Sequence, residues 1–414
     1  MMSRDLEEGE LRESPIVAAE PPQKRRRCLE KSMSPFINTD DVTSVVDGIT
    51  VFATSLLMSK KPVLTQEEGT YERIKLIGQG TFGEVHQACR LSDGVMVALK
   101  KIRMEEYNNF PITAIREFQT LKRLDHPHIL GLIDMCYKDF DGKRDFYMVS
   151  HFCSHDLAGI LTKPDLKMEP HIVKTLLHHL FLGLAYLHKN GFIHRDFKSA
   201  NILLSPDGCL KLADFGLVRD TRTASNKVFT SNVVTMWYRP PEILLGSKSY
   251  TFAIDLWGAG CIVAEFWTRI PIFPGKTEAH QLALIARLCG TISPKTMPGC
   301  SELPYYENMR TALEQGPPTL LQKMRPMIPN VYAMELVSQL LILDPEKRLT
   351  AAQVLDHRYF HSEPLPLSNV EEFVQSLKGN YFGVNTAYMC DINCGLQKGE
   401  RRGIANGQLY DRIY

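Results

Sequence analysis

The feature that most constrains the fold is a change in the spacing of apolar residues along the chain. From Tyr71, runs such as YERIKLIGQG and VMVALKKIR alternate apolar and polar residues between glycine-containing breaks, which predicts an antiparallel series of strands. From about Leu157 the apolar residues instead recur with helical spacing, as in VKTLLHHLFLGLAYLHKNG. A small β-rich unit followed by a larger α-rich unit predicts a two-lobed α+β fold.

The length of the chain fits one large two-lobed domain with further segments at its ends, since it has 414 residues. We assign residues 71–153 to the β-rich lobe and its connection to the second lobe, and residues 154–361 to the α-rich lobe. Residues 1–70 pass from acidic to Pro-rich sequence, and the C-terminal extension 362–414 is polar without clear periodicity from about position 366. We therefore expect flexible N- and C-terminal tails.

Charge and hydropathy limit the kinds of partner. Lys24 to Arg27 (residues 24–27) form a compact basic cluster that is typical of a nuclear-localisation signal, although a solvated run of charge would read the same. The formal net charge of the chain is +1, which excludes a general attraction to nucleic acid or to an anionic membrane. The apolar stretch 42–58 contains Asp47 and several hydroxyl groups, so it is too short and too polar for a membrane span. We expect no direct nucleic-acid partner and no membrane partner.

Three glycines, Gly78, Gly80 and Gly83, lie in the segment GQGTFG between two strand-like runs. In a dinucleotide-binding fold the same glycine pattern opens a helix. Its position here instead favours a hairpin whose backbone N–H groups cover phosphates. A tight β-turn without a ligand remains an alternative for this motif taken alone.

Lys100 lies at the end of VALK, in the second strand-like run after the glycine-rich segment. A lysine that faces inward from a strand needs an anion beside it, because burial of an unpaired charge is costly. A nucleotide phosphate and Glu117 are suitable partners. Glu117 lies in NNFPITAIREFQTL, which predicts an amphipathic helix with Pro111 at its first position. The alternative is a surface lysine on an edge strand, a place that Lys101 could equally take, because alternation sends the two side chains to opposite faces.

The segment HRDFKSAN carries residues suited to phosphoryl transfer. Asp196 can accept or orient a hydroxyl proton, Lys198 can neutralise a transferred phosphoryl group, and Asn201 offers an oxygen ligand for Mg²⁺. Asp214, in ADFG, is the second metal ligand, and Mg²⁺ binds through few protein ligands plus phosphate oxygens. The glycine-rich segment, Lys100, HRDFKSAN and ADFG in this order predict phosphoryl transfer from ATP.

With these motifs, residues 71–361 resemble a eukaryotic protein kinase, which implies a β-rich N-lobe and an α-rich C-lobe. The resemblance continues into WYRPPEILLG and implies an ion pair between Glu242 and Arg348 that anchors the activation segment. Asp255 stands where the family has a structural residue of the C-lobe.

Among the kinases, FPITAIRE, DLWGAGCIVAEFWTR and HQLALIARLCG look closest to the transcription-elongation branch of the cyclin-dependent kinases. This likeness implies a T-type or K-type cyclin bound to the 111–117 helix. It also implies that the C-terminal repeats of RNA polymerase II are the protein substrate and that the enzyme acts in the nucleus.

Two other functions are alternatives to this one. A cell-cycle or cyclin-activating kinase would have the same chemistry, but the PITAIRE helix differs from that of the cell-cycle branch, and Phe82 replaces an inhibitory tyrosine. An inactive kinase-like scaffold would lack Lys100, Asp196 or Asp214, and all three are present.

The resemblance places the activating phosphothreonine of the branch at Thr230. It implies that Arg116 in the predicted helix, Arg195 in HRDFKSAN and Arg219 after Asp-Phe-Gly surround the phosphate, whose charge would offset theirs. The alternative is three independently solvated arginines.

The resemblance also implies a preference for the residue that follows the target Ser or Thr. Val233, Val234 and Arg239 match the surface by which these kinases select proline there, so the implied motif is Ser/Thr-Pro. Thr235 is implied to hydrogen-bond Asp196 and Lys198 as part of the catalytic machinery.

An ATP site is implied between the two lobes. His151 and Cys153 would pair with adenine through their backbones, and Asp156 would lie near the ribose. Two positions in or near this site depart from the family pattern: Ser150 replaces a bulky Phe and implies room for larger inhibitors, and Ser199 stands where proline or alanine is usual. The other residues implied to contact ATP, with Lys100 and Asp214, are Ile77, Gly78, Gly80, Gly83, Val85, Ala98 and Leu203, with Ala213 behind the nucleotide.

Overall fold

The structure is a computed structural model of the chain. It describes residues 65–80, 83–104, 110–140, 143–163, 165–222, 236–379 and 381–382. The predicted basic cluster at 24–27 lies outside these residues, as do Phe82, Thr230, Val233, Val234 and Thr235.

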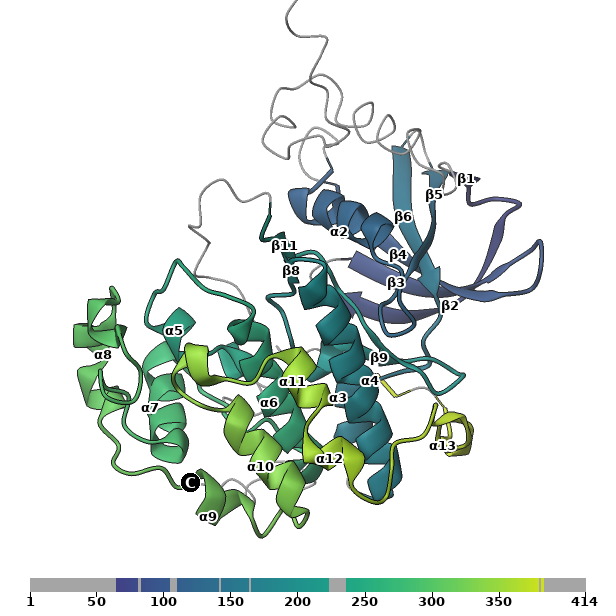
Figure 1. Cartoon of the computed structure of the whole chain (residues 1–414). Helices are drawn as coiled ribbons and strands as arrows, with labels where there is room; N and C mark the ends of the chain where they lie inside the picture. Colours follow the sequence, from purple (N-terminus) through teal and green to yellow (C-terminus); the bar gives the residue numbers. More distant parts are fainter. Residues whose placement is uncertain are drawn as a thin grey trace, which may run out of the picture.

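The N-lobe is a six-stranded sheet in the order β1-β5-β6-β4-β3-β2, with the helix α2 beside it (Figure 1). β1 pairs with β5 in parallel, and the other neighbouring strands are antiparallel. Alternation along β4 buries Val97 and Leu99 in a small core on one face and leaves Lys100 on the other face. The strands are β1 (Thr65–Gln66), β2 (Tyr71–Gly80), β3 (Gly83–Arg90), β4 (Met96–Ile102), β5 (Leu132–Phe140) and β6 (Lys143–His151).

The helix α2 spans Ile112–Arg123 and is amphipathic, as its sequence predicted. Ile115 and Phe118 are buried in the main core, whereas Ile112, at the start of the helix, is 37% exposed. Pro111 is the N-cap and not the first helical residue, because its φ of −62° is compatible with a helix while its ψ of 138° is extended. The helix thus presents one packed face and one partly open end.

The C-lobe is helical, and α4 (Pro170–Lys189) and α6 (Ala253–Thr268) are its longest helices. α6 has buried side chains on all sides, including Trp257, so it runs through the middle of the lobe. The other helices are α3 (Leu157–Leu161), α5 (Pro241–Leu244), α7 (Glu278–Cys289), α8 (Tyr306–Leu313), α9 (Leu320–Met324), α10 (Val331–Leu340), α11 (Ala351–Leu355) and α12 (Arg358–His361).

Two small sheets lie on the side of the C-lobe that faces the N-lobe (Figure 1). Their strand orders are β10-β9-β7 and β11-β8. They carry the loops on which the predicted catalytic residues stand. The strands are β7 (His155–Asp156), β8 (Phe192–Ile193), β9 (Ile202–Leu204), β10 (Leu210–Leu212) and β11 (Arg219–Asp220).

The described part of the C-terminal extension, residues 362–379 and 381–382, returns to the connection between the lobes, where the sequence predicted a tail without regular structure. It forms α13 (Glu371–Ser376), and the Tyr381 N–H then donates to His155 Nδ1 at 2.9 Å. The Asp156 N–H donates to Tyr381 O at 3.0 Å. Local periodicity did not reveal this segment because residues far away in the sequence hold it in place.

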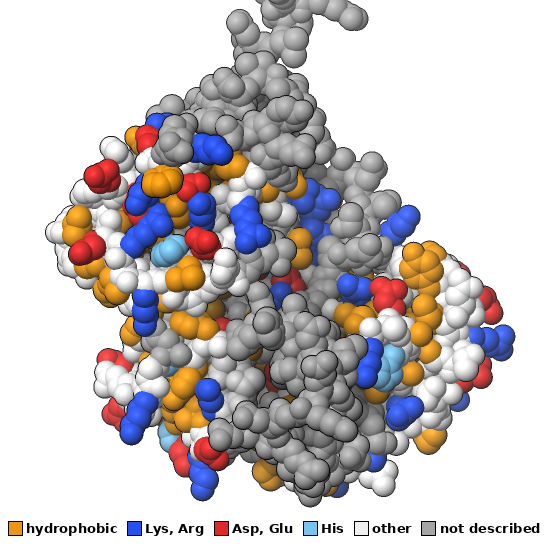
Figure 2. Space-filling model, turned by 180° about the vertical axis from the view of Figure 1, so that it is seen from behind, with side chains coloured by type: hydrophobic (Ala, Val, Ile, Leu, Met, Phe, Trp, Pro, Cys, Tyr) orange, Lys and Arg blue, Asp and Glu red, His pale blue; other side chains and the backbone are white. Residues whose placement is uncertain are grey.

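On the face opposite to that of Figure 1, Lys and Arg side chains of the N-lobe are interspersed with acidic and hydrophobic ones (Figure 2). Across the described residues, no helix combines the length and the apolar character that crossing a membrane requires.

Candidate active site

β2 and β3 form the glycine-rich hairpin predicted from the sequence. Their register pairs Gly78 with Val85 and ends at the pair Gly80–Gly83. Gly83 has a φ of 127°, and a Cβ atom there would lie 2.3 Å from the carbonyl oxygen of Lys101, so the position requires glycine. Because Val85 pairs with Lys100 across β3 and β4, the two side chains share one face of the sheet.

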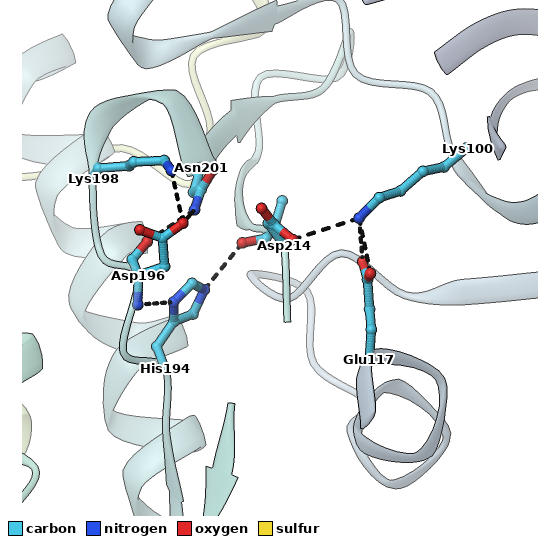
Figure 3. A network of polar contacts seen from close by, with 8 residues as sticks. Lys100, Glu117, His194, Asp196, Lys198, Asn201 and Asp214 are labelled. Carbon is cyan, nitrogen blue, oxygen red and sulfur yellow. Dashed lines mark hydrogen bonds and ion pairs between the residues drawn. The ribbon is translucent and has the colours of Figure 1, made fainter. Parts of the chain in front are cut away.

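The side chain of Lys100 reaches from β4 toward two carboxylates (Figure 3). Its Nζ lies 2.9 Å and 2.8 Å from the two carboxylate oxygens of Glu117 on α2, and 3.5 Å from Asp214 Oδ1. Burial alone would lower the pKa of Lys100, but the negative charges of Glu117 and Asp214 outweigh burial and raise it. Lys100 therefore stays protonated. Lys101 takes the opposite face and pairs with Asp145 at 2.6 Å.

Asp214 connects the N-lobe half of the site to the C-lobe half (Figure 3). Burial would raise the pKa of its carboxyl, but the positive charges of Lys100 and Lys198 outweigh burial and lower the pKa, so the group is ionised. Its φ of 62° is unusual for a residue other than glycine. The neighbouring Ala213 carbonyl lies 3.0 Å from His194 Nε2, which ties the Asp214 segment to the loop that carries Asp196.

Asp196 is the centre of the catalytic loop. Lys198 Nζ donates to Asp196 Oδ2 at 2.7 Å, and Asn201 Nδ2 donates to the same oxygen at 2.9 Å and to the Asp196 carbonyl at 2.8 Å (Figure 3). The nitrogen of the Asn201 amide is thus fixed by Asp196, which leaves the amide oxygen to act as an acceptor. The structure brings Asp196, Lys198 and Asn201 together as the sequence predicted.

The helix α6 supplies the anchor of this loop. Asp255 accepts hydrogen bonds from the backbone N–H groups of His194 at 2.8 Å and Arg195 at 2.9 Å, and its Oδ2 lies 2.9 Å from His188 Nε2. Arg195 has a φ of 67°, which is strained for an L residue, and its bond to Asp255 helps to hold the loop in that conformation. The sequence indicated a structural place for Asp255 but gave no sign of its partners, and it did not single out His188.

The residues predicted to contact ATP come from both lobes. Ala98 pairs with Ser150 across β4 and β6, on the same face of the sheet as Lys100. Leu203 pairs with Asp156 across β9 and β7 on the C-lobe side. The Asp156 carboxylate also caps α3, because it accepts a hydrogen bond from the Gly159 N–H at 2.6 Å.

The segment between the lobes carries the two residues predicted to pair with adenine. His151 ends β6, and Cys153 follows with its side chain buried. Burial raises the pKa of the Cys153 thiol to about 12, so the thiol is neutral. The predicted contact with adenine uses backbone groups and does not need a thiolate. Ile77 precedes Gly78 on β2.

Two of the three arginines predicted to hold a phosphate lie near one another. The Arg195 side chain is buried, and it donates from Nε to Leu217 O at 2.6 Å and from Nη1 to the Tyr250 hydroxyl at 2.9 Å. Burial lowers the pKa of Arg195, and the positive charge of Arg219 adds to this effect. Arg219 Nε is buried and has no hydrogen-bond partner within the described part of the chain. Arg116 lies half-buried on α2.

The predicted ion pair of Glu242 and Arg348 is confirmed. Arg348 Nη1 lies 2.6 Å from Glu242 Oε1, and Nη2 lies 2.8 Å from Glu242 Oε2. Both residues are buried, so this bidentate pair fixes α5 against the segment that follows α10. It closes the C-terminal end of the predicted activation segment.

The donor set of the site suits a divalent cation bound with phosphates. Asn201 offers an amide oxygen and Asp214 an ionised carboxylate, and Mg²⁺ characteristically combines few protein oxygens with phosphate oxygens. Lys100 and Lys198 place positive charge on either side of Asp214. Asn201 and Asp214 could therefore hold a divalent cation, which would neutralise the charge of bound phosphate groups.

Comparison with known proteins agrees with this geometry. The family model described as protein kinase domain matches residues 71–360. Cyclin-dependent kinase 9 of Homo sapiens is 44% identical over 308 residues, covering 72% of this chain and 82% of the human protein. The probable cyclin-dependent kinase 9 of Caenorhabditis elegans is 42% identical over 356 residues, covering 77% of this chain and 74% of that protein.

A solved structure is also similar over most of the chain. It is the crystal structure of the yeast RNA Pol II CTD kinase CTDK-1 complex, with a TM-score of 0.66 and 33% sequence identity. The match covers 74% of this chain and 98% of that chain.

Proposed function

This chain belongs to the protein kinase family and is similar to cyclin-dependent kinase 9, and from that premise we propose that it is a proline-directed kinase that transfers the γ-phosphoryl group of ATP to Ser or Thr residues. The observation that carries the proposal is the contact of Lys100 with Asp214, which joins the ATP-orienting pair of the N-lobe to the catalytic loop of the C-lobe. A kinase site needs both halves at once, because positioning and charge neutralisation supply most of the catalysis.

In the proposed reaction, Asp196 orients the substrate hydroxyl and accepts its proton. Lys198, which donates to Asp196, neutralises charge on the transferred group. Thr235 would add a hydrogen bond to both. Lys100 contacts the nucleotide phosphates while Glu117 holds its amine in place. We assign all four side chains and Glu117 to catalysis.

The nucleotide is proposed to bind between the lobes. Asn201 and Asp214 would hold Mg²⁺, which when bound neutralises phosphate charge. The backbones of His151 and Cys153 would receive adenine, and Asp156 would contact the ribose. The walls of the pocket would be formed by Ile77, Gly78, Gly80, Gly83, Val85, Ala98 and Leu203, with Ala213 behind the nucleotide.

A cyclin is proposed as the activating partner, in contact with the 111–117 segment at the start of α2. The similarity to cyclin-dependent kinases supports this partner, and the exposed side chain of Ile112 provides an apolar contact. We propose a T-type or K-type cyclin. Phosphorylation of Thr230, bound by Arg116, Arg195 and Arg219, would complete activation.

The proposed protein substrate is the C-terminal repeat region of RNA polymerase II, which places the enzyme in the nucleus. Two comparisons support this substrate: the relatives are named cyclin-dependent kinase 9, and the similar solved structure is an RNA Pol II CTD kinase complex. Repeated Ser/Thr-Pro sites in one flexible chain would suit the expected selection of proline after the target residue.

The test is a kinase assay on the complex of the full chain with its co-purified cyclin. Two peptides are compared that differ only in the residue after the target serine, proline in one and alanine in the other. The expected result is a preference for the proline peptide of about tenfold or more in kcat/KM, because each 1.4 kcal/mol of selectivity is tenfold in rate. Equal rates on the two peptides would contradict the proposed substrate motif.

The matched control is the variant Asp196→Asn, which keeps the size of the side chain and its hydrogen bond from Lys198 but loses its basicity. We expect phosphorylation of the proline peptide to fall by about 10²–10⁴-fold, the usual contribution of a positioned general base. Activity that survives the substitution would mean that another group accepts the proton.

A further inference from the structure

Three side chains from three elements form a buried polar cluster to which the proposed mechanism gives no role. Ser199 belongs to the turn Ser199–Asn201 of the catalytic loop, Tyr238 to the turn Met236–Tyr238 near the end of the activation segment, and Glu265 to α6. Their exposed fractions are 3%, 1% and 4%. So deeply buried a cluster depends on hydrogen bonds made within the protein.

The three side chains contact one another in a closed ring. Ser199 Oγ lies 3.2 Å from Glu265 Oε1, Tyr238 Oη lies 2.8 Å from Glu265 Oε2, and Ser199 Oγ lies 2.9 Å from Tyr238 Oη. Each of these oxygen–oxygen contacts is short enough to be a hydrogen bond and needs one hydrogen. The two hydroxyl groups bring two hydrogens, and an ionised carboxylate brings none. The ring is one hydrogen short unless Glu265 is protonated.

The surroundings of Glu265 favour the neutral acid. Cys261, one turn earlier on α6, adds no positive charge, because burial raises the pKa of its thiol and keeps it neutral. Glu265 forms no ion pair within the described part of the chain. Lys198 and Arg239, the cations next to Ser199 and Tyr238 in sequence, have acidic partners of their own, as does Arg348, whose charge acts on Cys261. These pairs are Lys198–Asp196, Arg239–Glu278 and Arg348–Glu242. Burial raises the pKa of Glu265 to about 7, although the bonds from Tyr238 and Ser199 act in the opposite direction.

We propose that Glu265 holds a proton in the folded enzyme, and that this proton completes a hydrogen-bond ring through which α6 positions the catalytic loop against the end of the activation segment. Ser199 follows Lys198 directly, and Tyr238 comes four residues before Glu242, so the ring joins the catalytic loop to the end of the activation segment. Ser199, Tyr238 and Glu265 are positioning residues. The usual proline or alanine at position 199 could not close the ring. The inference rests on the proposed phosphoryl transfer at Asp196.

The proton has a measurable effect on folding. In the unfolded chain Glu265 releases its proton near the ordinary glutamate value of 4.5, and in the folded enzyme it does so only near 7. Between these values the folded state holds one proton more than the unfolded state, so stability falls as the pH rises through the window. Above it this contribution to stability is lost.

The first experiment compares the melting temperature of the wild-type chain with that of Glu265→Gln from pH 5 to pH 9. The Gln side chain has an N–H donor and a carbonyl acceptor, like a protonated carboxyl, and cannot titrate. The difference in melting temperature is expected to change in favour of Glu265→Gln as the pH rises from about 5 to about 8. A difference that stays constant across the whole range would show that Glu265 does not bind a proton in this window.

The second experiment measures kcat for a Ser-Pro peptide over the same pH range, with the cyclin-bound enzyme and with Ser199→Ala. If the ring positions the catalytic loop, the kcat ratio of wild type to Ser199→Ala is several-fold at pH 6 and falls toward one above pH 8, because the wild-type ring then loses its proton. The KM for ATP should change little in both. Parallel pH profiles would overturn the positioning role, even if Glu265→Gln does not fold.

The two proposals fail in different ways. A wild-type complex that phosphorylates no Ser/Thr-Pro peptide would contradict the proposed function, while the melting comparison would still decide whether Glu265 holds a proton. An active wild type whose kcat profile is parallel to that of Ser199→Ala, and whose melting difference from Glu265→Gln is constant with pH, would contradict the inference alone.

Discussion

The two halves of the catalytic site are held in different ways. On the C-lobe side, Asp255 on the largely buried helix α6 binds the backbone of the catalytic loop directly. On the N-lobe side, Glu117 holds Lys100 from α2, a helix that is packed on one face and has Ile112 exposed at its start. The catalytic loop is therefore set when the C-lobe folds. The position of Lys100 depends on how α2 is seated.

This difference suggests where regulation acts. A helix buried on all sides cannot shift without disrupting the core, because protein interiors are close-packed. A helix with one open side can move as a unit between two positions, and a partner that binds only one of them shifts the equilibrium. We expect a cyclin to control the Lys100–Glu117 pair and to leave the Asp196 loop unchanged.

The largest effect is expected from Asp255→Ala, which removes the anchor of the catalytic loop in the C-lobe half of the site. Two backbone N–H groups and His188 lose their acceptor in a buried place, and each unsatisfied donor costs about 1–3 kcal/mol. The free energy of unfolding should therefore fall by about 3 kcal/mol or more, and phosphorylation should be lost with it. Urea unfolding of the purified chain measures the change.

Asp255→Asn is the control for this prediction. The amide keeps the shape of the side chain and one acceptor oxygen, so it should restore about half of the lost stability if hydrogen bonds to Asp255 are what hold the loop. A full loss with the amide would mean that the negative charge itself, beside His188, is what matters.

The next largest effect is expected from Glu117→Gln, which breaks the other half. Lys100 would lose the charge of Glu117 and keep its contact with Asp214, so it would be drawn away from the nucleotide phosphates. We expect kcat to fall by about 10²-fold, the scale of losing one preorganised electrostatic contact. The free energy of unfolding should change by only about 1 kcal/mol, because the amide still accepts a hydrogen bond from Lys100.

The contrast between Asp255→Ala and Glu117→Gln is the sharpest check of the comparison. One should cost mainly stability and the other mainly rate. If Glu117→Gln unfolds the protein as readily as Asp255→Ala does, then α2 is as firmly built in as α6 and the two halves do not differ.

Thr230→Ala should have a smaller effect on rate. The positive charges of Arg195 and Arg219 lie near each other, and in the variant no phosphate at position 230 can neutralise them. The charge-assisted hydrogen bonds to that phosphate, about 1.5–3 kcal/mol each, are then lost. We expect the cyclin complex to lose about ten- to hundredfold in kcat, with little change in the KM for ATP. A peptide kinase assay of the variant and of phosphatase-treated wild type should give the same loss.

The catalytic motifs were readable from the sequence because their chemistry requires fixed residue types at short spacing. Asp196, Lys198 and Asn201 stand within six consecutive residues, and the structure bonds them to one another. The two-lobed architecture was readable because hydrophobic period changes where the strands end and the helices begin.

The supports of the site could not be read in this way. Ser199 and Glu265 are 66 positions apart, and Tyr381 and His155 are 226 apart, so no local pattern connects them. The C-terminal extension has no strong periodicity, so the sequence did not reveal that Tyr381 bonds to residues at the connection between the lobes. Glu242 and Arg348 were an exception, since a known family pairs residues at those places.

A modest effect on assembly is expected from Ile112→Asp. The substitution puts a charge at an exposed apolar position near the start of α2, and desolvating an unpaired carboxylate in an interface is unfavourable. We expect the dissociation constant for the cyclin to rise by about tenfold, which corresponds to about 1.4 kcal/mol. Binding can be followed by surface plasmon resonance.

Leu321→Asp is the matched control for Ile112→Asp, because Leu321 is an exposed apolar residue on α9 of the C-lobe. It should leave the affinity for the cyclin unchanged. Equal weakening by both substitutions would point to a general effect of added charge and not to a contact at α2.

The smallest effect on the use of ATP is expected from Ser150→Phe, which fills the back of the proposed ATP site. Ser150 pairs with Ala98, so two small side chains lie side by side on the face that carries Lys100. A bulky ring there should alter the KM for ATP by less than about threefold, since the nucleotide is expected to lie in front of it. Inhibitors with a large group behind the adenine position should lose more than about tenfold in affinity, as overpacking costs about 1–3 kcal/mol. If such inhibitors bind the wild type no better than Ser150→Phe, the space next to Ala98 is closed by other side chains. The departure at position 150 would then have no consequence for the pocket.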